Sequence, residues 1–215
     1  MTELPAEPRM TEQKPPKKSL EKLLRRTFSS VLDGIAAFLL NLGLKPDHIT
    51  LAGLCGNIAA AVLIGSGRLV WGGLAAALMG PLDALDGAMA RKLGTPTRFG
   101  GFLDSVIDRY DELLLLGGVL VFFTRSGNTP GIYLTYAAAA GSVLVSYMRA
   151  RAEALGFDGK VGLLTRVERY IILILGLLLN LTIYSVGIIA ILGNATAVQR
   201  FLYVKKQAGD YAQPE

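Results

Sequence analysis

Four aspartates have the residue type and the spacing to hold a divalent cation. Asp83 and Asp86 are three residues apart, and Asp104 and Asp108 are four apart, so each pair would share one face of a helix. The segment 92–98 between the pairs is short and contains a glycine and a proline, which favours a tight turn. The sequence therefore predicts two antiparallel, neighbouring helices whose acidic faces meet.

The chemistry of such a site would be that of hard cations bound by oxygen. The chain has one histidine, His48, and one cysteine, Cys55, so a cluster of imidazole or thiolate ligands is excluded. Carboxylate oxygens suit Mg²⁺, Mn²⁺ or Ca²⁺, and two such ions beside a pyrophosphate would hold a centre for phosphoryl transfer. The alternative is that the acids are end-of-helix residues paired with lysine or arginine, but it does not explain why four of them face one cavity.

Small residues accompany the aspartates along both predicted helices. Gly87 follows the second aspartate and Gly100 lies one turn before the third, so a substrate or a partner helix can approach closely. Ala90 keeps the same face small, and Arg91 places a fixed positive charge where phosphates would bind. Helix packing through small residues is the alternative interpretation.

The elements that must position these residues are membrane helices. Apolar residues make up 52% of the 215 residues and charged residues only 18%, where a soluble domain carries about 25% charged residues. Charge-free runs of 19, 23 and 30 residues cover 49–67, 126–148 and 170–199. A membrane-spanning helix needs roughly 20 apolar residues, so the longest run is expected to hold two helices that turn near 180–182. The predicted fold is all-α and integral to the membrane, with six transmembrane helices near 47–66, 68–93, 98–124, 130–155, 162–181 and 183–206.

The distribution of lysine and arginine predicts the orientation of these helices. Of 22 basic residues, only Arg68 and Arg125 fall on the side opposite the two termini. Basic residues collect on the cytoplasmic side of membrane proteins. Both termini and the four aspartates are therefore expected on the cytoplasmic side of the cell membrane, and the formal charge of +5 is interpreted as a topology signal and not as nucleic-acid binding.

The chain is expected to divide into four segments. Residues 1–18 are polar and proline-rich, which predicts a disordered cytoplasmic tail and no signal peptide. In 19–43, apolar residues recur at steps of three and four, which predicts an amphipathic juxtamembrane helix in the cytoplasmic interface. Packing of this helix against the rim of the bundle is the alternative. The six-helix domain covers 44–206, and 207–215 is expected to be a cytoplasmic tail.

The acids and small residues together form the pattern D-x-x-D-G-x-x-A-R-x8-G-x3-D-x3-D, which resembles the signature of the CDP-alcohol phosphatidyltransferases. All eight fixed positions are present, from Asp83 to Asp108. The resemblance implies that a CDP-linked lipid such as CDP-diacylglycerol donates a phosphatidyl-type group to an alcohol and that CMP is released. The six helices and the N-terminal amphipathic helix also look like the layout of that family.

The resemblance also implies roles for individual residues. It implies two Mg²⁺ or Mn²⁺ ions held by the four aspartates, with Asp108 as the base, because a carboxylate beside the acceptor hydroxyl can take its proton. Asp47 matches the family's start of the first helix only loosely, and capping of that helix is an equal alternative. A homodimer is the family's default. The expected CDP-binding residues are Gly87, Ala90, Arg91, Gly100, Asp47 and Thr50.

A group of arginines points to an acceptor that carries a phosphate. Arginine forks suit phosphate oxygens, whereas a neutral acceptor would not need them. The segments S-Y-M-R-A-R-A-E from 146 and R-x-E-R from 166 resemble the phosphatidylinositol-phosphate synthases, which use inositol phosphate. Glycerol 3-phosphate is the alternative acceptor, and flanking topology charge is the alternative role of each arginine. The expected acceptor-binding residues are Ser146, Arg149, Arg151, Arg166, Arg169 and Arg200.

A cation transporter is the alternative from a different class, because acids inside a small helical bundle also suit ion transport. Acids that carry ions lie near the middle of the bilayer, often on broken helices. Here they are predicted at the cytoplasmic ends of two helices, beside Arg91, which would repel a cation. The sequence therefore favours the transferase.

Overall fold

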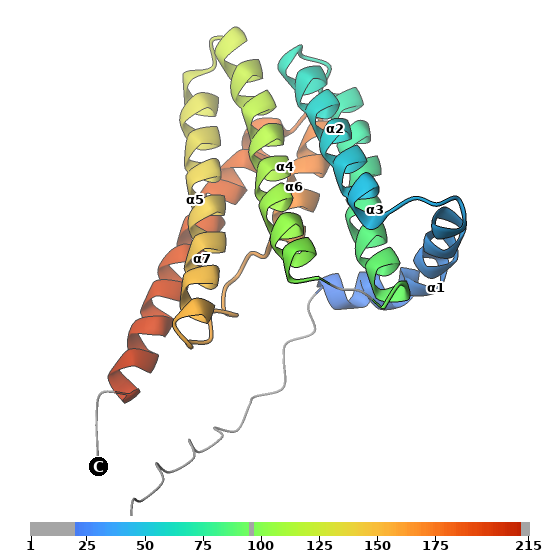
Figure 1. The fold of residues 1–215 in the computed structure, drawn as a ribbon. Helices are drawn as coiled ribbons and strands as arrows, with labels where there is room; N and C mark the ends of the chain where they lie inside the picture. Colours follow the sequence, from blue (N-terminus) through green and yellow to red (C-terminus); the bar gives the residue numbers. More distant parts are fainter. Residues whose placement is uncertain (1–19, 95–96, 212–215) are drawn as a thin grey trace, which may run out of the picture.

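A computed structural model of the chain describes residues 20–94 and 97–211, with side chains described over 31–94 and 97–209. Within these residues the protein forms helices and no strand (Figure 1). The helices are α1 (Leu20–Asn41), α2 (Pro46–Gly65), α3 (Leu69–Lys92), α4 (Arg98–Arg125), α5 (Thr129–Ala154), α6 (Arg166–Leu178) and α7 (Thr182–Tyr211). The all-α prediction is confirmed for this part of the chain, and the predicted tail 1–18 lies outside it.

Four of the helices are long and apolar enough to cross a membrane. They are α2, α3, α5 and the part of α7 that ends at Gly209. The chain is therefore a multi-pass membrane protein. Helix α4 has 28 residues, but acids and arginines crowd its first half, and α6 has only 13 residues. The six predicted spans thus go beyond the four that length and composition support.

Helix α2 is the element around which the candidate site is arranged. It packs against α3 and against α4 (Figure 1). Across the described residues the backbones of α3 and α4 are not closely packed against each other. The predicted meeting of their acidic side chains is confirmed for Asp83, Asp104 and Asp108. Helix α5 pairs with α7, and α6 packs against α3 and α7. Helix α1 lies across the end of the bundle where α3 turns into α4 (Figure 1).

Small residues let α2 and α4 approach closely. A Cβ atom at Gly118 would lie 2.5 Å from the carbonyl oxygen of Ala61, so a larger residue would push the helices apart. Ile64, Leu115 and Val119 are fully buried beside this contact and belong to the main apolar core. The core therefore lies deeper in the bundle than the aspartates and fixes the two helices beneath them.

Three predicted helix ends differ from the structure by three residues or more, among them the end of α6 at Leu178 and not at 181, and one turn is confirmed. Asn180 has a left-handed φ of 55° in the turn between α6 and α7, where the turn was expected. Helix α6 begins at Arg166 and not at 162, because the backbone N–H of Thr165 donates to Glu168 Oε2 at 2.5 Å and caps the helix. Helix α7 runs to Tyr211, past the predicted end at 206. In its last turns, the side-chain amide of Gln207 is hydrogen-bonded to the backbone of Asp158.

Candidate metal centre

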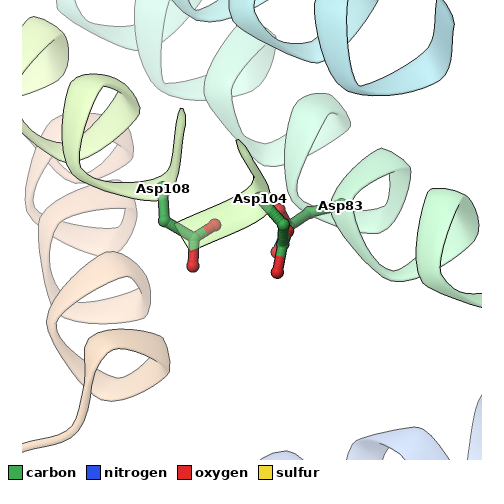
Figure 2. Close-up of side chains that lie close together, drawn as sticks. All are labelled: Asp83, Asp104 and Asp108. Atoms are coloured by element: carbon green, nitrogen blue, oxygen red, sulfur yellow. The ribbon is translucent and has the colours of Figure 1, made fainter. Parts of the chain in front are cut away.

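Three of the four predicted ligands converge at one point. Asp83 of α3 and Asp104 and Asp108 of α4 each offer a carboxylate oxygen, and these oxygens all lie within 4.8 Å of one another. Figure 2 shows the three side chains pointing into the same space between the two helices. The donor set is entirely carboxylate oxygen, which fits a hard divalent cation such as Mg²⁺ or Mn²⁺.

Local sequence features shape the two helices beside these acids. Thr97 caps the N-terminus of α4, accepting a hydrogen bond from the Gly100 backbone N–H at 2.9 Å. Pro81 lies inside α3, two residues before Asp83, and its missing N–H removes one hydrogen bond from the preceding turn. Beside that turn, the Tyr170 hydroxyl of α6 donates to a carbonyl of α3 at 2.6 Å. The sequence analysis did not single out this proline or this tyrosine.

Asp86, the fourth predicted ligand, is hydrogen-bonded to α2. It lies one helical turn after Asp83 and is only 6% exposed. The hydroxyl of Thr50 donates to its Oδ2 atom at 2.5 Å. Thr50 had been expected in the nucleotide pocket and Asp86 at the metal, so the structure joins two residues to which the sequence analysis gave separate roles. The metal-ligand role of Asp86 remains a prediction.

Arg166 is the arginine that contacts the acids. It opens α6, donates a hydrogen bond to Asp83 Oδ2 at 3.1 Å and forms an ion pair with Asp108. Because Asp83 belongs to α3 and Asp108 to α4, this single guanidinium bridges two helices whose backbones are not closely packed against each other. Arg109 adds a second positive charge, 3.5 Å from Asp108. The acids are thus partly neutralised by residues of the chain itself.

Two other predicted acceptor residues make buried structural contacts. Arg169 is 2% exposed, and its Nε and Nη2 atoms donate to the carboxylate of Glu112 at 2.6 and 2.9 Å. Arg200 is 6% exposed and donates to the carbonyl oxygens of Val161 and Val145 at 2.7 and 2.5 Å. Arg169 thus joins α6 to α4, and Arg200 joins α7 to α5 and to the connection between α5 and α6. Roles in acceptor binding remain predictions for both.

The remaining predicted acceptor residues lie on α5. Arg149 forms an exposed ion pair with Glu153 at 3.0 Å. Arg151 is exposed, and Ser146 is partly buried. The structure therefore does not bring the five predicted arginines together in one contact network. Of these five, Arg166 is the one that contacts the aspartates in the described part of the chain.

The predicted nucleotide-side residues follow the two acidic helices. A Cβ atom at Gly87 would lie 3.3 Å from a guanidinium nitrogen of Arg91, so this glycine leaves room for the arginine. Gly100 lies in the first turn of α4, and Ala90 is partly buried. Asp47 is exposed in the first turn of α2, whose N-cap is Lys45, so Asp47 is not itself the cap.

A third acid on the same face of α4 was not among the predicted site residues. Asp111 lies three residues after Asp108 and seven after Asp104, spacings that would have placed it on the acidic face. It is 6% exposed, and its carboxylate is hydrogen-bonded by the side chain of Asn57 on α2. Asn57 is 4% exposed and was also missed.

Comparison with known proteins identifies the group to which this site belongs. The family model described as CDP-alcohol phosphatidyltransferase matches residues 44–199. The chain belongs to the CDP-alcohol phosphatidyltransferase family. The matched range holds all eight residues of the motif and every acid of the candidate metal centre. This family member is therefore a transferase.

The sequences of two named synthases align with most of the chain. An archaetidylinositol phosphate synthase of Methanothermobacter thermautotrophicus is 37% identical over 188 residues, which are 85% of this chain and 90% of the relative. A phosphatidylinositol phosphate synthase of Mycobacteroides abscessus is 38% identical over 156 residues, which are 72% of this chain and 71% of the relative.

Solved structures of a further relative have the same fold. The crystal structure of a Mycobacterium tuberculosis phosphatidylinositol phosphate synthase with CDP-DAG bound superposes with a TM-score of 0.77 at 32% identity, covering 81% of this chain and 94% of that one. A structure of the same enzyme in complex with manganese and citrate gives a TM-score of 0.76, also at 32% identity, and covers 81% and 88%.

Proposed function

We propose that this family member transfers a phosphatidyl-type group from a CDP-linked lipid to inositol phosphate and releases CMP. The observation that carries the proposal is the convergence of Asp83, Asp104 and Asp108 between α3 and α4, with Arg166 in contact with two of them. Support for the donor comes from the relative solved with CDP-DAG, and support for the acceptor from the names of the relatives.

The reaction requires one bond to form and one to break at phosphorus. The acceptor hydroxyl oxygen attacks the lipid-side phosphorus of the pyrophosphate, the bond from that phosphorus to the CMP phosphate breaks, and CMP leaves. Two divalent ions held by the aspartates would offset the negative charge on the pyrophosphate and the leaving group. Asp108 is assigned as the base that takes the hydroxyl proton, because it is partly buried at 13% side-chain exposure and faces the other acids.

Arg166 is the residue that can couple the acceptor to the metal centre. Its guanidinium carries more hydrogen-bond donors than its contacts with Asp83 and Asp108 use. A phosphate on the acceptor would be a partner for the remaining donors. The other residues assigned to acceptor binding are Ser146, Arg149, Arg151, Arg169 and Arg200.

The orientation and the number of membrane spans are part of the proposal. We assign six spans, with α4 and α6 crossing beside the four apolar helices, and both termini and the aspartates on the cytoplasmic side. The domain is assigned to 44–206. Helix α1 is assigned to the cytoplasmic interface, because Val31, Ile35, Phe38 and Leu42 recur at steps of three and four and are each at least 44% exposed. A homodimer is retained as the expected assembly.

The experiment that tests the function is CMP release by the purified protein in detergent. CDP-diacylglycerol is supplied with inositol phosphate, glycerol 3-phosphate, inositol or serine, each at several concentrations. The highest kcat/KM is expected with inositol phosphate and a low value with inositol. Preference for glycerol 3-phosphate would support the alternative acceptor, and no CMP release with any of the four would overturn the assignment.

A further inference from the structure

Two polar residues of α2 each hold one acid of a different helix. Thr50 donates to Asp86 of α3, and Asn57 hydrogen-bonds Asp111 of α4. Thr50 and Asn57 are seven residues apart, so they lie two turns apart on one face of α2. Helix α2 therefore contacts both acid-bearing helices through side chains, whereas the backbones of these two helices are not closely packed against each other.

Each held acid is one turn from an acid of the metal centre. Asp86 follows Asp83 by three residues, and Asp111 follows Asp108 by three residues. A shift of α4 along α2 would therefore change the separation between the carboxylates of Asp83 and Asp108. The close approach of Gly118 to α2, seven residues beyond Asp111, limits the spacing of the helices, while the Asn57 contact limits their register.

The burial of the Asn57–Asp111 pair argues that stability is not its main contribution. Both side chains are more than nine-tenths buried, at 4% and 6% exposure. The Oδ1 atom of each has no hydrogen-bond partner among the described residues. A buried pair that leaves two acceptors unpaired costs stability, and an apolar pair of similar size would avoid that cost.

We infer that Asn57 and Asp111 are positioning residues of the metal centre, which set the register of α4 against α2 and thereby the separation of Asp108 and Asp104 from Asp83. Neither residue belongs to the eight-position motif. The inference rests on the proposed metal-binding role of the three acids. Residues that orient metal ligands without touching the metal typically change metal affinity or activity by roughly 10- to 100-fold when they are replaced.

The variant Asn57→Asp distinguishes an effect of charge from an effect of positioning, because the two predict opposite changes in the affinity for a divalent cation. An added negative charge near the centre would by itself strengthen the binding of a cation. Two opposed carboxylates would instead push α2 and α4 apart and weaken binding. The positioning role therefore predicts at least roughly tenfold weaker Mn²⁺ binding, measured by electron paramagnetic resonance on the full chain in detergent without substrate.

A double variant that exchanges the two residues is expected to rescue the defect of Asn57→Asp. Asn57→Asp combined with Asp111→Asn restores a carboxylate–amide pair with the same net charge, and is expected to recover most of the Mn²⁺ affinity and of kcat. If Asn57→Asp does not fold, Asn57→Leu replaces it, because this neutral variant leaves the charge unchanged and is still expected to weaken Mn²⁺ binding by roughly tenfold.

Two control variants separate positioning from general loss of stability. Ser142→Ala removes a buried hydroxyl of α5 that has no partner in the described part of the chain, and Ile189→Ala opens the core of α7. Both are expected to keep the wild-type Mn²⁺ affinity even where the melting temperature falls. Unchanged or tighter Mn²⁺ binding in Asn57→Asp and Asn57→Leu, or an exchange variant no better than Asn57→Asp, would overturn the inference. Because the Mn²⁺ titration uses no lipid, it is independent of whether the wild type releases CMP from CDP-diacylglycerol.

Discussion

The hydroxyl of Thr50 on α2 lies 2.5 Å from the carboxylate of Asp86 on α3 and donates a hydrogen bond to it. Asp86 is almost completely buried, so this bond replaces contacts with water that the carboxylate has lost. A residue expected in the nucleotide pocket thus also supports an acid expected at the metal. The orientation of Asp86 is set by two helices and not by α3 alone.

Replacement of Thr50 by valine should remove this bond without changing the size of the side chain. A hydrogen bond to a charged group is worth about 1.5–3 kcal/mol, which corresponds to a loss of roughly 10- to 100-fold in kcat/KM for the CDP-lipid. Thr50→Ser keeps the hydroxyl and is expected to retain near-normal activity. Steady-state CMP release measures both variants, and equal rates for valine and serine would remove Thr50 from the site.

Removal of divalent cations should abolish turnover. With three carboxylates within 4.8 Å of one another, the centre needs positive charge before it can accept a pyrophosphate. Treatment with EDTA is expected to stop CMP release, and added Mg²⁺ or Mn²⁺ to restore it. Full turnover in metal-free buffer would contradict the proposed centre.

Asp104→Asn should lose both Mn²⁺ binding and turnover, because it removes one of the charged ligands from the centre. Asp33→Asn is the matched control, since Asp33 is exposed on α1. Binding of Mn²⁺ is measured by electron paramagnetic resonance and turnover by CMP release. If the two variants behave alike, Asp104 is not a ligand.

Asp108→Asn should abolish turnover while binding of the CDP-lipid largely survives. Asparagine keeps the size and one oxygen of aspartate but cannot accept the proton of the acceptor hydroxyl. Binding is measured by titration of CDP-diacylglycerol in the presence of Mg²⁺, and turnover by CMP release. A near-normal kcat would show that Asp108 is not the base, and lost donor binding would favour a role as metal ligand.

Glu112→Gln should lower the melting temperature of the protein. Arg169 would then be buried with neutral partners only, including the carbonyl of Leu164, and breaking a buried ion pair costs about 3–5 kcal/mol. The double variant Glu112→Leu with Arg169→Met removes both charges and is expected to be less destabilised than the single variant. Thermal unfolding in detergent measures both. A double variant less stable than Glu112→Gln would show that the pair itself stabilises the fold.

Arg151→Ala should raise KM for inositol phosphate by roughly 10- to 100-fold. This factor corresponds to the loss of one hydrogen bond between charged groups, which is worth about 1.5–3 kcal/mol. The affinity for the CDP-lipid should stay nearly unchanged, because Arg151 lies on α5 and makes no contact with the acids in the described structure. Arg125→Ala, at the opposite end of the bundle, is the control. An effect confined to the donor would assign Arg151 to another role.

The sequence by itself determined the class of fold and the chemistry of the centre. Apolar runs of membrane-spanning length can only form helices there, because every backbone N–H and C=O must be paired inside the chain. The spacing of the aspartates sets which of them share a helix face, since this depends only on 3.6 residues per turn. The turn near Asn180 followed in the same way from the length of the last charge-free run.

Only the tertiary structure decided which residues meet between helices. Spacing along one helix does not determine the register of that helix against another. The sequence therefore predicted that the acidic faces of α3 and α4 meet, but not that α2 packs against both helices. The bonds from Thr50 to Asp86 and from Asn57 to Asp111 join residues 36 and 54 positions apart. The partners of Arg166, Arg169 and Arg200 could not be predicted from the sequence either. The side chain of an arginine is long, so its partner depends on which helices lie within reach.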